Sequence, residues 1–130
     1  MAKLIEKYVS VVRLNRGIAT AYPITVQGVT SGTSVVLAST ATPTIAATSS
    51  MIIHTPTQNE TINFPATGSV GQELFLEVLT SGTTSFTLTY GANVRSQGVL
   101  ATGIVSAAIF IVAFVFDGTR FVETGRTTAQ

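Results

Sequence analysis

Short apolar stretches separated by turn-forming residues run along most of this 130-residue chain. They are rich in β-branched and aromatic residues, and glycine or proline interrupts the windows in which a long helix could form. Strands repeating at roughly 8–12-residue spacing are typical of β-sandwiches and barrels. The sequence therefore predicts an all-β fold, an antiparallel β-sandwich or jelly roll. We expect strands at residues 18–27, 34–38, 51–55, 60–64, 73–79, 85–90, 106–116 and 120–124.

Charged residues are scarce and unevenly placed. They make up 10% of the chain, against about 25% in an average domain. Residues 1–16 hold four basic groups and one acidic group, a local charge of +3, whereas the rest holds three basic and five acidic groups, a charge of −2. We therefore divide the chain into a basic N-terminal arm, residues 1–16, and one β-sandwich domain, residues 17–130. The arm's pattern fits a strand, a helix or an extended segment, and slightly favours the extended one.

The basic arm is expected to make contact outside the subunit's own core. Arginine side chains can form bidentate contacts with carboxylates at a partly desolvated interface. A solvated tail without a partner is the alternative. The arm carries too few cations to predict a nucleic-acid partner. The residues expected to face acidic groups on a neighbouring subunit or a shell protein are Lys3, Lys7, Arg13 and Arg16.

No segment has the length of a membrane span. The most apolar run, residues 104–116, has 13 residues, whereas a spanning helix needs about 20. The first residues also lack the apolar core and the small-residue cleavage site of a signal peptide. We therefore expect no membrane partner and synthesis in a cytoplasm.

The expected strand at residues 106–116 is apolar on both faces. A strand in a two-layer domain normally has one polar face, so a second apolar face indicates a further cover, often a neighbouring subunit. The low charge of the chain also favours self-association. The sequence therefore predicts a homo-oligomer, and the residues expected at the subunit interface are Ile109, Phe110, Ile111, Phe114 and Phe116.

Two local patterns refine the expected strands. In residues 73–78, Glu73, Phe75 and Glu77 share one face of the strand, which is expected to be the wetter face. Further along, Asp117 and Gly118 join two apolar stretches, the strongest short signal for a hairpin. This pair favours a two-residue type I′ turn, because glycine tolerates a positive φ.

The residues that could carry catalysis do not form a recognisable set. A Ser-His-Asp triad would need the only histidine, His54, and the only aspartate, Asp117. We expect Asp117 to be a turn residue and His54 to lie on a wet strand face. Glu73 and Glu77 would lie about 13 Å apart along a strand, too far for a glycosidase pair, although Glu60 or Glu123 could approach one of them.

Metal and cofactor sites are not predicted either. The chain has one histidine and no cysteine, so a zinc site cannot be assembled, and no phosphate-binding loop or calcium-binding loop occurs. We therefore expect a non-enzymatic protein with no catalytic residues, no bound metal and no cofactor.

Three motifs carry a resemblance to a known group. They are a GQELxLEV strand at residues 71–78, an SFTLTxGxN strand at residues 85–93 and a closing FxFDGTxFxE hairpin at residues 114–123. Together they resemble the small β domains of tailed-phage virion proteins, both capsid decoration (cement) subunits and the head domains of fibres. The resemblance covers roughly residues 50–126, and Phe121 stands where tryptophan is more common. It implies a homotrimer, with a dimer as the alternative, and no enzymatic activity.

The two readings within this group differ in function. A decoration protein docks on the major capsid protein and stabilises the shell, whereas a fibre head presents side chains to a receptor or glycan. A 130-residue chain that begins at Met1 with its own basic arm lacks the long shaft of a fibre. We therefore expect a capsid decoration protein on the virion surface, with the fibre or spike head domain as the alternative.

Overall fold

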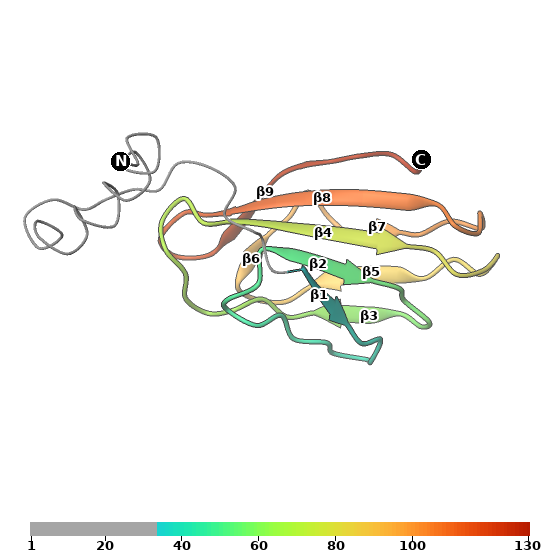
Figure 1. Ribbon diagram of the computed structural model, residues 1–130, viewed down its shortest axis with the longest axis horizontal. Coiled ribbons are helices and arrows are strands. Elements are labelled where there is room, and N and C mark those ends of the chain that lie inside the picture. Colours follow the sequence, from blue (N-terminus) through green and yellow to red (C-terminus); the bar gives the residue numbers. More distant parts are fainter. Residues whose placement is uncertain (1–33) are drawn as a thin grey trace, which may run out of the picture. The chain divides into compact units, whose positions relative to one another are not determined.

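A computed structural model describes residues 34–130 of the chain, which contain nine strands and no helix (Figure 1). The all-β prediction is confirmed for these residues, whereas the expected strand at residues 18–27 and the arm lie outside them. The strands form one six-stranded sheet and one three-stranded sheet. In spatial order the larger sheet contains β1 (Ser34–Leu37), β2 (Met51–His54), β4 (Glu73–Leu79), β8 (Ile109–Phe116), β9 (Phe121–Arg126) and β6 (Val94–Arg95). The smaller sheet contains β3 (Glu60–Ile62), β5 (Thr87–Tyr90) and β7 (Leu100–Ala101).

Each strand expected within the described residues overlaps an observed strand, and β6 and β7 were not predicted. These two strands have two residues each, too few to show an alternation of apolar and polar positions. The start of β8 also differs from the expected residue 106. Ala107 has a φ of 60°, the left-handed region, so the regular strand begins only at Ile109.

The prediction of an antiparallel arrangement is wrong for much of the fold. The pairings β1–β2, β2–β4, β3–β5 and β6–β9 are parallel, whereas β4–β8, β5–β7 and β8–β9 are antiparallel. For two of the parallel pairs the chain crosses to the other sheet between the partners. It passes from β2 to β3 in the other sheet before it returns to β4, and from β3 to β4 before it returns to β5.

The hairpin predicted at Asp117 and Gly118 joins β8 to β9, but its turn is not type I′. The backbone N–H of Asp117 donates to the carbonyl of Arg120 at 3.0 Å, which places Gly118 and Thr119 at the centre of the turn. Only Gly118 has a positive φ, of 103°, whereas type I′ requires two such residues. The Asp117 carboxylate accepts from the backbone N–H groups of Thr119 and Arg120, at 2.8 and 2.9 Å.

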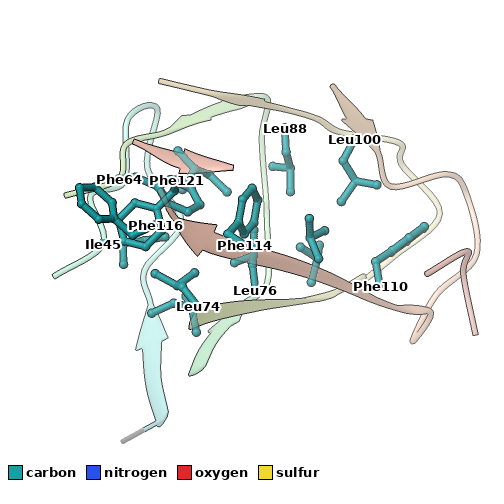
Figure 2. Close-up of a cluster of buried hydrophobic side chains, with 14 of the residues drawn as sticks. Ile45, Phe64, Leu74, Leu76, Leu88, Leu100, Phe110, Phe114, Phe116 and Phe121 are labelled. Atoms are coloured by element: carbon teal, nitrogen blue, oxygen red, sulfur yellow. The ribbon is translucent and has the colours of Figure 1, made fainter. Parts of the chain in front are cut away.

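One hydrophobic core joins the two sheets (Figure 2). Alternate residues of β8, from Phe110 to Phe116, point into it, and Leu88 and Leu100 enter it from the smaller sheet. An aromatic group fills one end, with the Phe114 ring centroid 4.7 Å from that of Phe64. One face of the six-stranded sheet therefore packs in the core, and the other face points away from it.

Candidate functional site

The outward side of the six-stranded sheet, which we call the outer face, is the candidate functional site. Its side chains alternate with the buried ones along each strand, as the period of a strand requires. Most of them are apolar and half-buried, and Phe75 is 37% exposed. The apolar members of the face on β2, β4, β8 and β9 are Met51, Ile53, Phe75, Leu79, Ile109, Ile111, Ala113, Val115 and Val122.

The registers of the strands place these side chains in rows across the sheet. One row joins Met51, Phe75 and Ala113, and a second joins Ile53, Glu77 and Ile111. Glu73 and Glu77 are the acidic groups of β4, and they lie on this face rather than toward the core. A mostly apolar face with a few charged groups is typical of a protein–protein contact, because a single domain seldom leaves a large apolar surface exposed to water.

The residues predicted at the subunit interface divide between the two faces of β8. Ile109 and Ile111 lie on the outer face, half-buried. Phe110, Phe114 and Phe116 instead point into the subunit's own core, where their exposed fractions are 7%, 1% and 4%. The strand is apolar on both faces, as the sequence indicated, but its three phenylalanines stabilise the domain itself. The predicted arm contacts Lys3, Lys7, Arg13 and Arg16 lie outside the described residues.

The half-buried Ser39 forms a hydrogen-bonded cluster with the buried residues His54 and Glu60. The side chains of His54 and Glu60 are fully buried, and His54 Nε2 lies 2.7 Å from Glu60 Oε2. His54 Nδ1 lies 3.0 Å from the carbonyl oxygen of Leu37, and the Ser39 hydroxyl donates to the second oxygen of Glu60. The expectation that His54 lies on a wet strand face is therefore wrong.

The hydrogen bonds of this cluster fix the proton at one nitrogen of His54. A carbonyl oxygen only accepts, so His54 Nδ1 carries a hydrogen and donates to Leu37. One further proton lies between His54 Nε2 and Glu60, and the pair is neutral overall whichever atom holds it. The Ser39 oxygen also accepts from the backbone N–H of Thr57, at 3.0 Å. The cluster thus joins the end of β1 to β2 and β3, a structural role.

The alternation of core and outward positions around Glu60 in the sequence indicates that its side chain is buried. Glu60 lies two residues before Ile62 and four before Phe64, both core residues, so it shares their face. His54 likewise follows Ile52 by two residues on β2. A histidine and a carboxylate that both take core positions on strands near in sequence predict a buried pair, since neither is stable there alone.

The sequence-predicted catalytic candidates are not brought together. His54 pairs with Glu60, while Asp117 lies exposed in the β8–β9 turn and binds backbone N–H groups. These backbone bonds hold the pKa of the Asp117 carboxyl below its usual value. Of the four glutamates, Glu60 and Glu123 each bind a basic partner. Glu73 and Glu77 lie on the outer face.

A second ion pair, between Glu123 and Arg126, fixes the segment between β6 and β7. Arg126 Nε lies 2.6 Å from Glu123 Oε1, and the same guanidinium donates to the carbonyls of Gly98 and Val99. Burial of Glu123 raises its pKa, but the hydrogen bonds from Arg126 and from the backbone N–H of Gln97 outweigh burial and hold the pKa below its usual value. Nearby, burial raises the pKa of Tyr90 to about 12.

This ion pair predicts an acid-sensitive contribution to stability. The pKa of Glu123 is lower in the folded state than in the unfolded state. The ion pair therefore contributes its full stabilisation at a pH above the ordinary glutamate pKa of about 4.3, and this stabilisation is lost as the pH falls through the lowered pKa. The urea midpoint of Glu123→Gln should therefore lie below that of the native chain at pH 6. The difference between the two urea midpoints should narrow toward pH 3. A difference that stays constant between pH 6 and pH 3 would contradict the stabilising role of this ion pair.

Residues 34–130 contain neither a metal-ligand cluster nor a membrane-spanning helix. No group of three or more histidine, aspartate or glutamate side chains is placed to hold a metal ion in this range. Within the same residues, no helix is long and apolar enough to cross a membrane. Comparison with known proteins gives no matching family model and no match among curated proteins.

Proposed function

We propose that this chain is a non-enzymatic structural protein of a tailed-phage virion, a capsid decoration protein that docks on the head shell and stabilises it. The observation that carries the proposal is the outer face, a sheet surface with mostly apolar side chains in a chain with 10% charged residues. In this reading the two sheets form a β-sandwich of the jelly-roll type, modified by the parallel pairings. The subunit is made in the host cytoplasm and resides on the capsid surface.

The proposed mechanism is burial of apolar surface across subunit boundaries. Removing apolar side chains from water contributes about 25 cal/mol for each Å² buried, so a face of this kind stabilises whatever it joins. The partners are copies of this chain and the major capsid protein. The resemblance of the motifs at residues 71–123 supports three copies, with two as the alternative.

One surface feature favours the alternative, a fibre or spike head domain. The loop between β7 and β8 exposes Ile104 and Val105, which are 68% and 62% accessible. Thr80 fixes this loop through its backbone and its hydroxyl, which accepts from the N–H of Ala108 at 2.8 Å. A rigid loop with exposed apolar side chains suits recognition of a receptor.

Cryo-electron microscopy of the phage that encodes the chain tests the proposal. We expect density for the two sheets on the outer surface of the capsid, repeated with the symmetry of the shell. Density at a fibre tip would support the alternative, and density at neither place would contradict both. In the capsid position, Lys3, Lys7, Arg13 and Arg16 should face acidic groups of a neighbour.

A further inference from the structure

We propose that copies of this chain associate through one row of the outer face, with Arg95 of one copy facing Glu73 of the next. The inference rests on the self-association proposed above and names the side chains that direct it. The row crosses β6, β9, β8 and β4 and consists of Arg95, Val122, Val115 and Glu73.

The strand registers place these four side chains in line. Arg95 pairs with Val122, Val122 with Val115, and Val115 with Glu73. All four point away from the core, since their neighbours Val94, Phe121, Phe114 and Leu74 are the ones that pack in it. The row therefore has a cation at one end, a carboxylate at the other and two half-buried valines between them.

The order of charges makes the row complementary to itself. Four adjacent strands separate its two ends by about 14 Å, at about 4.8 Å for each strand. If a second copy is turned about an axis parallel to the strands, its Glu73 lies against Arg95 of the first copy and the valines meet in the middle. A two-fold dimer satisfies this pairing twice, and a closed ring of three satisfies it once at each contact.

Charge complementarity is the reason to choose a second copy as the occupant. Within residues 34–130, the ion pairs are His54–Glu60 and Glu123–Arg126, so Arg95 and Glu73 form none there. An unrelated apolar partner would gain nothing from opposite charges at the two ends of a row. A second copy matches both ends at once, and opposite charges at the edge of an apolar contact fix its register.

Charge reversal in the full-length chain tests the inference. We expect sedimentation equilibrium to show a dimer or trimer for the native chain. Arg95→Glu should weaken this association about tenfold or more, because two carboxylates then face each other. Glu73→Arg should do the same by placing two cations together. The double variant, Glu73→Arg with Arg95→Glu, should restore the native association, since the row is then reversed but still complementary.

Arg120→Glu is the matched control, because Arg120 is also exposed but lies in the β8–β9 turn outside the row. It should leave the association unchanged. A monomeric native chain, an unchanged Arg95→Glu variant, a double variant that fails to recover, or an equal loss in Arg120→Glu would each overturn the inference. The proposed function is tested separately by the position of the subunit on the virion, so either proposal can fail alone.

Discussion

Replacing Glu60 by alanine should lower the free energy of unfolding by about 3–5 kcal/mol, the range for breaking a buried ion pair by removing one partner. The change leaves His54 Nε2 fully buried without its hydrogen-bond partner and the Ser39 hydroxyl without its carboxylate. The chain contains no tryptophan, so urea unfolding should be followed by far-ultraviolet circular dichroism.

Glu77→Ala is the control for this substitution. Glu77 lies on the outer face and forms no ion pair within residues 34–130, so its loss should change stability by less than about 1 kcal/mol. The loss of stability in Glu60→Gln should lie between the losses in Glu60→Ala and Glu77→Ala, because an amide keeps the shape of the side chain and part of its hydrogen bonding. If Glu60→Ala and Glu77→Ala have equal effects, the cluster does not stabilise the fold.

Seven of the nine strands were predictable because each of them carries a local signal, which the two-residue strands β6 and β7 lack. The alternation in β4 and the Asp-Gly pair between β8 and β9 depend on neighbouring residues only, and both appear in the structure near their expected positions. The direction of pairing depends instead on which sheet the chain enters after each strand. No local pattern in β2 shows that β3 belongs to the other sheet, so the parallel pairing of β2 with β4 could not be inferred.

Only part of the candidate site could be inferred from the sequence, because the choice of the core face of β8 depends on its neighbouring strands. The double apolar character of β8 is present in the structure, where one of its faces packs in the core and the other is half-buried. It did not indicate which face packs in the core, because Ile109 and Phe110 are equally acceptable inside a protein. The choice follows from the other strands, where Leu74, Leu76 and Val78 of β4 face the core and pair with the phenylalanine side of β8.

Phe114→Ala should destabilise the fold by about 3–5 kcal/mol, the cost of a cavity left by a buried aromatic side chain. Phe114 is 1% exposed, and its ring lies 4.7 Å from Phe64 and 5.5 Å from Tyr90 between centroids. Its replacement by glutamate would bury a charge without a partner and should unfold the domain. Thermal unfolding and urea titration of the purified variants measure both effects.

Phe75→Ala provides the matched comparison, because it removes the same side chain from the opposite face of the sheet. Phe75 is 37% exposed on the outer face, so its loss should change the unfolding free energy of the separate subunit by about 1 kcal/mol or less. If copies associate through this face, the same variant should weaken association measurably. A Phe75 variant as unstable as the Phe114 variant would show that the outer face stabilises the domain itself, and the division between core and contact surface would then be wrong.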